Sequence, residues 1–111
     1  MHANVILIGS TGLGAGDSNL GSLLLANFLR LLAERADLPQ YIVLWNEGVK
    51  IALDESICIN HLKRLEERSV DIVSCRTCIE FFGLEGGITA GRIGTMPEIQ
   101  EILLGGQVLT V

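Results

Sequence analysis

The chain is poor in aromatic and basic residues. Aromatic residues make up 5% of its 111 positions, which leaves little surface on which bases or sugars would stack. Eight Lys and Arg stand against thirteen Asp and Glu, which gives a formal net charge of −5, and the basic residues form no cluster. Because an acidic surface repels phosphate backbones, nucleic-acid binding is not expected.

Long apolar segments are also missing. Runs such as 5–8 are far shorter than the roughly 20 residues that a helix needs to cross a bilayer. The N-terminus lacks the basic and long apolar parts of a secretory signal. We therefore expect no membrane association and a cytoplasmic location, where the three cysteines would be thiols rather than a disulfide framework.

The composition that remains is that of a folded domain. Hydrophobic residues make up 49% and charged residues 19%, which excludes disorder. The length suits one domain, and no repeat, low-complexity tract or linker divides it. Residues 1–111 are therefore expected to form a single domain.

Short apolar runs alternate with helix-like segments along the chain. Strands are predicted at 3–8, 41–44, 70–74, 107–111 and, weakened by Gly91, 88–93. Helical segments are predicted after residue 17, near 49–53, over 56–68, from 75 to about 83, and from 96 to 104. This alternation predicts a three-layer α/β/α fold with a mainly parallel sheet of about five strands, in a flavodoxin-like layout.

Helix caps and apolar faces refine this prediction. Asp17 or Ser18 is expected to cap the first helix, and Thr95 with Glu98 matches a capping box before the last. The helix 56–68 is expected to bury Cys58, Leu62 and Leu65. The face of the first helix predicted to pack on the sheet consists of Leu20, Leu23, Leu24, Phe28 and Leu31.

Unusual residues follow three of the predicted strands. A glycine-rich loop follows the first, Asn46 the second and Cys75 the third. In parallel sheets, ligands and catalytic groups lie beyond the carboxyl ends of the strands. We therefore expect a site at this edge, with Glu47 either an acid or base, judged by position only, or a solvated loop residue.

Cys75 is the first candidate for chemistry. It lies at a strand-to-helix junction, where the helix dipole and Arg76 would lower its pKa. A thiolate is the nucleophile in disulfide exchange and in the capture of sulfur from a persulfide. The competing interpretation is a buried core cysteine, a common environment for this residue.

Cys78 completes a Cys-x-x-Cys pattern with three interpretations. The pair could cycle between dithiol and disulfide, or form half of a zinc site, or Cys78 could be a bystander or resolving thiol. The remaining ligand types, His2, Cys58 and His61, form no second pair at zinc spacing. A bystander or resolving thiol is favoured over zinc, and neither metal nor cofactor is expected.

The glycine-rich loop 9–17 is similar to a phosphate cradle. Backbone N–H groups of Gly9, Ser10, Gly14 and Gly16, with Asn46, could face an anion. The loop lacks the Lys-Ser or Lys-Thr of a Walker A motif, and no frame gives Gly-x-Gly-x-x-Gly. A flexible connection is favoured, with an anion contact as the alternative.

A family resemblance joins these features. It covers nearly the whole chain and rests on residues at matching spacing: Gly9-Ser10, Leu13-Gly14, Gly16-Asp17, Leu20-Gly21, Asn46, Gly48-Val49-Lys50, Ser74-Cys75, Thr77-Cys78 and Phe82-Gly83-Leu84. The chain resembles the DsrE/DsrF-like family, and within it the C-terminal domain of YedF-type sulfurtransferase-like proteins of selenium metabolism.

This resemblance implies a sulfur-relay role. In relatives that relay sulfur, a cysteine at this strand end carries a persulfide and a glycine follows eight residues later, as Cys75 and Gly83 do here. The implied partners are sulfur-donor and sulfur-acceptor proteins, a TusA-like domain among them, and further copies in a homo-oligomer. The alternative is a non-catalytic oligomeric module that binds a small anion or a flavin at the glycine-rich loop.

Overall fold

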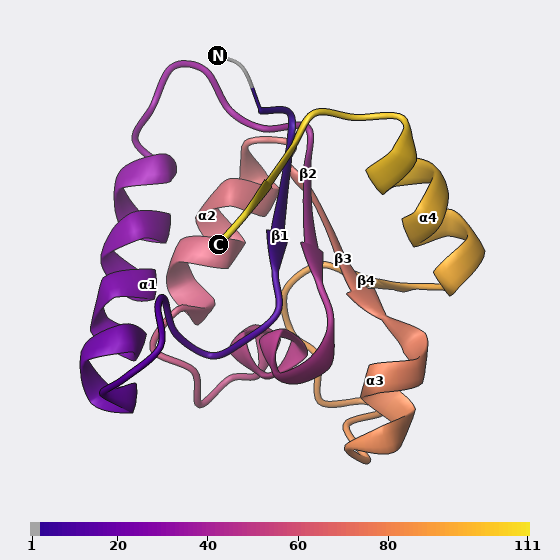
Figure 1. Ribbon diagram of the computed structural model, residues 1–111, viewed down its shortest axis with the longest axis horizontal. Helices are drawn as coiled ribbons and strands as arrows, with labels where there is room; N and C mark the ends of the chain where they lie inside the picture. Colours follow the sequence, from indigo (N-terminus) through magenta and orange to yellow (C-terminus); the bar gives the residue numbers. More distant parts are fainter. Residues whose placement is uncertain (1–2) are drawn as a thin grey trace.

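Five parallel strands form the sheet in the computed structural model, which describes residues 3–111 (Figure 1). The strands are β1 (Val5–Ile8), β2 (Tyr41–Leu44), β3 (Asp71–Cys75), β4 (Arg92–Gly94) and β5 (Val108–Thr110), in the order β4-β3-β2-β1-β5. β1, β2 and β3 are apolar along most of their length because both of their faces are covered. The predicted parallel sheet is confirmed.

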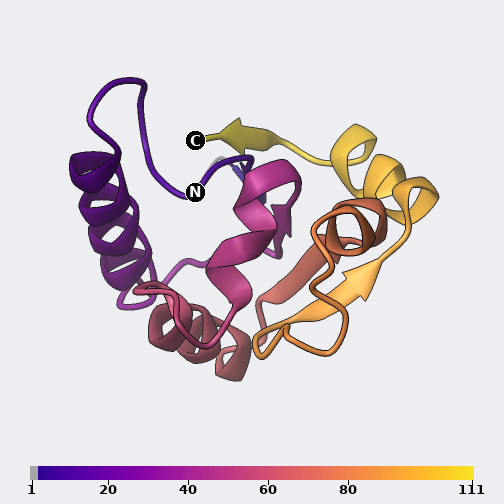
Figure 2. The ribbon, with the colours of Figure 1, turned by 90° about the horizontal axis from the view of Figure 1, so that it is seen from below.

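Helices cover both faces of this sheet. They are α1 (Ser18–Leu32), the 3-10 helix η1 (Asn46–Ala52), α2 (Ile59–Glu67), α3 (Arg76–Phe81) and α4 (Met96–Leu104). Figures 1 and 2 show α1 and α2 on one side of the sheet and α4 on the other, whereas α3 continues beyond the carboxyl end of β3. Side chains of Ile6 and Ile8 point to the α1–α2 side, and those of Val5 and Leu7 to the α4 side. The predicted three-layer α/β/α fold is confirmed.

The prediction for the face of α1 is wrong. Gly21, Leu25, Leu29 and Leu32 are the buried residues of α1. Phe28 is only half-buried, and the other four predicted core positions are exposed: Leu20, Leu23, Leu24 and Leu31. The predicted cap is confirmed, because the Asp17 carboxylate accepts a hydrogen bond of 2.9 Å from the backbone N–H of Leu20.

β4 is shorter than predicted and lies later. The predicted strand 88–93 contributes only an isolated bridge between Ile88 and Leu53 before β4 begins at Arg92. Gly91 has φ +77°, and a Cβ there would lie 2.5 Å from the carbonyl oxygen of Ile72. The chain turns closely past β3 at this glycine, so regular pairing starts only after it.

The capping box before α4 forms only in part. Thr95 occupies the N-cap position, but its side chain makes no capping hydrogen bond. The Glu98 carboxylate pairs with Arg92 at 2.6 Å, and this contact, with a smaller contribution from the Thr95 backbone, holds its pKa below the ordinary value. Glu98 therefore links α4 to β4.

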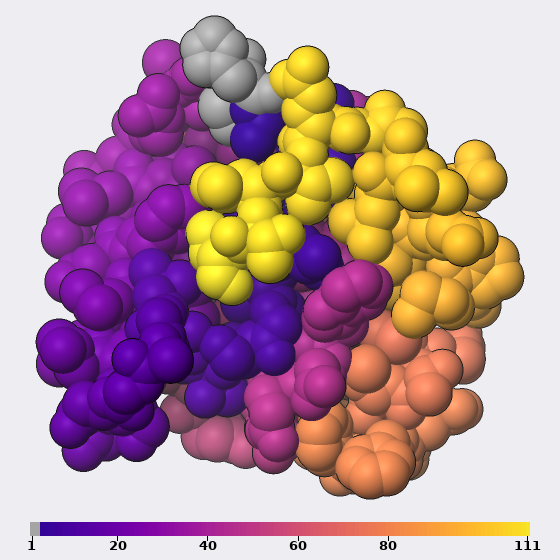
Figure 3. Space-filling view, viewed as in Figure 1, coloured from indigo at the N-terminus to yellow at the C-terminus, as the bar shows by residue number. Residues whose placement is uncertain are grey.

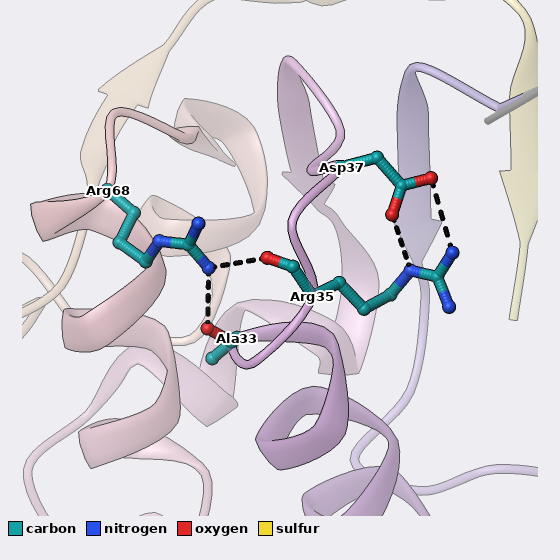
Figure 4. A network of polar contacts seen from close by, with 4 residues as sticks. All are labelled: Ala33, Arg35, Asp37 and Arg68. Carbon is teal, nitrogen blue, oxygen red and sulfur yellow. Dashed lines mark hydrogen bonds and ion pairs between the residues drawn. The ribbon is translucent and has the colours of Figure 1, made fainter.

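Arg68 connects the ends of α1 and α2. Its Nη1 donates to the carbonyl oxygens of Ala33, at 2.8 Å, and Arg35, at 2.7 Å (Figure 4). Arg35 in turn forms a forked pair with Asp37, with nitrogen–oxygen distances of 2.9 and 3.2 Å. One guanidinium thus satisfies two carbonyl groups where α1 ends and the loop to β2 begins.

The outer edge strand β5 lies open to solvent. All three of its residues are exposed, and Figure 3 shows the C-terminal segment on the surface of the molecule. Among the described residues, 3–111, its strand partner is β1. Within residues 3–111, none of the helices combines the length and apolar character needed to cross a membrane.

Candidate functional site

The carboxyl ends of β1, β2 and β3 meet at one edge of the sheet. The glycine-rich loop, η1 and α3 begin there, at the lower edge in Figure 1, and Figure 2 views this edge directly. η1 lies between the loop and α3, so the elements that carry the predicted site residues are neighbours in the order of their strands. The side-chain and backbone contacts among the loop, η1 and α3 show which of the predicted residues lie together.

Cys75 is the inner thiol of this edge. It is the last residue of β3 and the N-cap residue of α3, as expected for a strand-to-helix junction. Its exposed fraction is 1%, and it packs in the cluster on the α4 side of the sheet with Val73 and Ile99. Cys75 is therefore a buried thiol.

Cys78 is the outer thiol. It lies on α3 and is partly exposed. Its Sγ accepts a hydrogen bond of 3.0 Å from the backbone N–H of Asn46, and its side chain packs against the apolar cluster that contains Cys75. Asn46 lies 32 residues before Cys78 in the chain, yet the fold brings it to the two cysteines.

The position of the Asn46 N–H depends on an unusual stretch of backbone. Asn46 has φ +52°, a value uncommon outside glycine although asparagine tolerates it better than most residues. Two residues later, a Cβ at Gly48 would lie 2.2 Å from the carbonyl oxygen of Ile8. Glycine at position 48 therefore allows η1 to pack against the end of β1 and fixes where its first N–H points.

The environment of Cys78 disfavours its thiolate. Burial is the main cause that raises its pKa above that of an ordinary thiol, and the neighbouring Cys75 acts in the same direction. The hydrogen bond from Asn46 lowers the pKa but does not offset these effects. Cys78 is therefore a protonated thiol at neutral pH, with one N–H donor already directed at its sulfur.

A small apolar pocket opens onto Cys78. It has a volume of 210 Å³ and is lined by Asn46, Thr77, Cys78, Phe81 and Phe82. Phe81 has an exposed fraction of 83%, which is high for a large apolar side chain. The sequence analysis missed both phenylalanines as site residues, although their place directly after the Cys-x-x-Cys pattern was a usable signal.

Charged residues next to the pocket are already paired. The Lys50 ammonium lies 4.3 Å above the centre of the Phe82 ring and 2.6 Å from the Glu47 carboxylate. Glu47, a candidate acid or base by position, is thus tied to Lys50 on the same helix. The cation–π contact steadies the Phe82 wall of the pocket.

The glycine-rich loop forms a separate hollow. This hollow measures 160 Å³, and its lining includes Ser10, Gly14 and Gly16 but neither Cys75 nor Cys78. Gly9 lies apart from it, where a Cβ would meet the Trp45 indole at 3.4 Å. Of the predicted ligand-binding residues, only Asn46 therefore joins the cysteines.

The loop is poorly suited to an anion or a flavin. The Asp17 carboxylate already takes the Leu20 N–H at the start of α1, and it would repel an anion there. The Ser10 hydroxyl donates to the Gly12 carbonyl within the loop. The hollow is also smaller than the roughly 300 Å³ at which pockets for larger organic ligands begin.

The remaining candidates lie away from this edge. Cys58 is 1% exposed, which confirms that it belongs to the core, and its pKa is raised by burial. His61 lies half-buried on α2. Within the described part of the chain, His, Cys, Asp and Glu side chains form no group of three able to hold a metal ion.

Solved structures share this fold. The ychN protein from E. coli matches over 100% of both chains, with a TM-score of 0.69 and 23% identity. The MTH1491 protein of unknown function from Methanobacterium thermoautotrophicum matches over 96% of both chains, with a TM-score of 0.68 and 16% identity. The conserved protein of unknown function BT1422 from Bacteroides thetaiotaomicron covers 97% of this chain and 95% of its own, with a TM-score of 0.59 and 19% identity.

Sequence comparisons add no closer relative. No protein-family model matches the chain, and no curated protein matches it in sequence. The structural matches therefore establish a fold shared with ychN over the whole length of the chain.

Proposed function

We propose that the chain is a sulfur-relay protein in which Cys75 carries a persulfide and Cys78 assists its transfer. The observation that carries this proposal is the packing of the two thiols in one cluster, with the Asn46 N–H directed at the outer sulfur. Two thiols in contact can exchange a sulfur atom or close to a disulfide, and an N–H donor stabilises an anionic sulfur.

The family resemblance supports the same assignment. The spacing from Cys75 to Gly83 matches relatives that relay sulfur, and Gly83, with φ +66°, follows directly after the C-cap residue of α3. The proposed partners are a sulfur-donor protein and a sulfur-acceptor protein, with a TusA-like domain as the first to test. A YedF-type relation, and with it a place in selenium metabolism, belongs to this proposal.

Sulfur loading tests the proposal directly. The reduced protein is treated with a sulfane-sulfur donor, and its intact mass is measured beside that of Cys75→Ser and Cys58→Ser. We expect the wild type and Cys58→Ser to gain one sulfur atom that dithiothreitol removes, and Cys75→Ser to hold none stably. A wild type that gains no sulfur would show that the chain is not a sulfur carrier.

Self-association is the second part of the proposal, and α1 supplies the surface. Its leucines at 20, 23, 24 and 31 are between 44% and 59% exposed, and residues 18–29 carry no charge. Copies with a net charge of −5 repel one another over most of their surface, so an uncharged apolar face is where two copies meet with least repulsion. A homo-oligomer formed through α1 would cover these leucines.

A further inference from the structure

We propose that Cys78 is the thiol that takes sulfur from the donor, and that Cys75 receives it from Cys78. This inference rests on the proposed sulfur relay and assigns an order to its two thiols. The resemblance alone points to Cys75 as the carrier and leaves the role of Cys78 open. The structure separates the two by accessibility, because Cys78 lines the 210 Å³ pocket and Cys75 does not.

The burial of Cys75 is the first argument. Its side chain is 1% exposed and is enclosed by residues of the sheet and α4, including Val73 and Ile99. In-line attack on an external persulfide requires the donor's sulfur to approach the attacking sulfur directly. The donor reaches Cys78 in the observed conformation, whereas Cys75 is reached only from within the protein.

The contact between the thiols provides that inner route. Cys75 is the N-cap residue of α3, and Cys78 lies three residues later, packed against the cluster that contains Cys75, so a sulfur atom bound to Cys78 lies near the Cys75 sulfur. A persulfide moved to Cys75 would be shielded from solvent reductants by the same side chains that bury the thiol. The two positions thus suit an entry thiol and a storage thiol.

The chemistry of the two steps balances without an oxidant or reductant. The Cys78 thiolate attacks the terminal sulfur of a donor persulfide, the donor's S–S bond breaks, and the donor thiolate leaves and is protonated. The Cys75 thiolate then attacks the terminal sulfur on Cys78, and Cys78 leaves as the thiolate and takes the proton that Cys75 lost. The sulfane sulfur moves twice while the number of thiols stays constant.

The Asn46 N–H serves the outer thiol in both steps. The Cys78 Sγ carries negative charge as attacking thiolate and as leaving group, and the 3.0 Å hydrogen bond from Asn46 stabilises both. The pKa of Cys78 stays raised by burial even with this hydrogen bond, so the thiolate is a minor form at neutral pH. We therefore expect the rate at which Cys78 takes up sulfur to increase as the pH rises toward the raised pKa of this thiol.

The pocket also indicates the chemistry of the donor. Its wall is formed largely by Phe81 and Phe82, and Phe81 is 83% exposed in the free protein. A donor that presents its persulfide on an apolar segment would cover Phe81, whereas a small charged persulfide would leave it in water. The inferred donor is a protein whose persulfide-bearing cysteine has apolar neighbours.

Loading of four proteins with two donors tests the order of the thiols and the apolar donor. Wild type, Cys78→Ser, Cys75→Ser and Phe81→Ala are exposed to glutathione persulfide and to benzyl persulfide, and the added sulfur is located by peptide mass mapping over time. We expect Cys78→Ser to load more than about tenfold slower than wild type, because the entry nucleophile is gone. Cys75→Ser is expected to load on Cys78 and to lose that sulfur to dithiothreitol faster than wild type does.

Three other results would overturn parts of the proposal. If Cys78→Ser loads Cys75 at the wild-type rate, the order of thiols is overturned while the sulfur relay stands. If the wild type gains no sulfur from either donor, the relay itself fails and the order fails with it. If Phe81→Ala loads from both donors as wild type does, the apolar donor is overturned.

A measurement on the unaltered chain guards against a misfolded variant. Limiting N-ethylmaleimide is added to the reduced wild type, and the modified cysteines are identified by mass mapping. We expect Cys78 to be modified first, with Cys75 slow and Cys58, equally buried, as the control within the same chain. Modification of Cys75 before Cys78 would overturn the proposal.

Discussion

α1 and α2 pack side by side on the same face of the sheet, yet only one of them reveals its buried face in its sequence. In α2, the apolar residues Leu62 and Leu65 lie among Lys63, Arg64, Glu66 and Glu67, and both predicted core leucines are buried. In α1, leucines surround most of the helix, and the leucines exposed to solvent outnumber those that pack. An apolar stripe identifies a buried face only where polar residues mark the opposite one.

The largest expected effect comes from adjacent leucines of α1. Leu25→Ala is expected to lower the free energy of unfolding by about 2–5 kcal/mol, because Leu25 is fully buried and truncation leaves a cavity. Leu24→Ala, one position earlier and 44% exposed, is expected to change it by less than about 0.5 kcal/mol. Urea unfolding at low protein concentration measures both, and Leu62→Ala in α2 should match Leu25→Ala. Equal effects at positions 24 and 25 would mean that the buried face of α1 is misassigned.

The link between the two helices is expected to have a smaller effect. Arg68→Ala removes the guanidinium that donates to the carbonyl oxygens of Ala33 and Arg35, and we expect a loss of about 1.5 kcal/mol. Arg64→Ala is the matched control, since it removes an exposed arginine from the same helix. Chemical unfolding of both variants gives the comparison, and equal values would deny Arg68 a role in joining α1 to α2.

α1 and α2 also differ in how their N-termini are capped. α1 is capped by the Asp17 carboxylate, whereas the N-cap residue of α2, Cys58, makes no side-chain cap bond. Asp17→Ala is expected to cost about 1 kcal/mol, and Asp17→Asn much less because asparagine caps equally well. Thermal unfolding followed by circular dichroism separates the two variants. An Asp17→Asn variant as unstable as Asp17→Ala would show that charge rather than capping matters at this position.

The candidate site shows the same division between what a sequence reveals and what it does not. The strand ends followed from apolar runs and the topology rule, so Asn46 and Cys75 were correctly expected at one edge. The hydrogen bond from Asn46 to Cys78 was not foreseen, because it depends on one backbone angle and on the close packing of Gly48 against Ile8. The composition of the glycine-rich loop predicted an anion contact as one alternative. In the structure, the Asp17 carboxylate caps α1 and the Ser10 hydroxyl bonds to the Gly12 carbonyl, so these polar groups stabilise the fold.

The variant with the smallest expected effect on folding tests whether a second copy covers the outer leucines of α1. Leu24→Glu with Leu31→Glu places charges at two exposed positions, so the unfolding free energy of the single chain should change by less than about 1 kcal/mol. Self-association should be lost, because burying those carboxylates against a second copy carries a large desolvation cost. Sedimentation velocity of the wild type is expected to show more than one 12.0 kDa chain, and of the variant a monomer. Leu104→Glu, at a more exposed leucine on α4, is the control and should associate as the wild type does. A monomeric wild type, or a variant that still associates, would leave the outer leucines of α1 without a second copy to cover them.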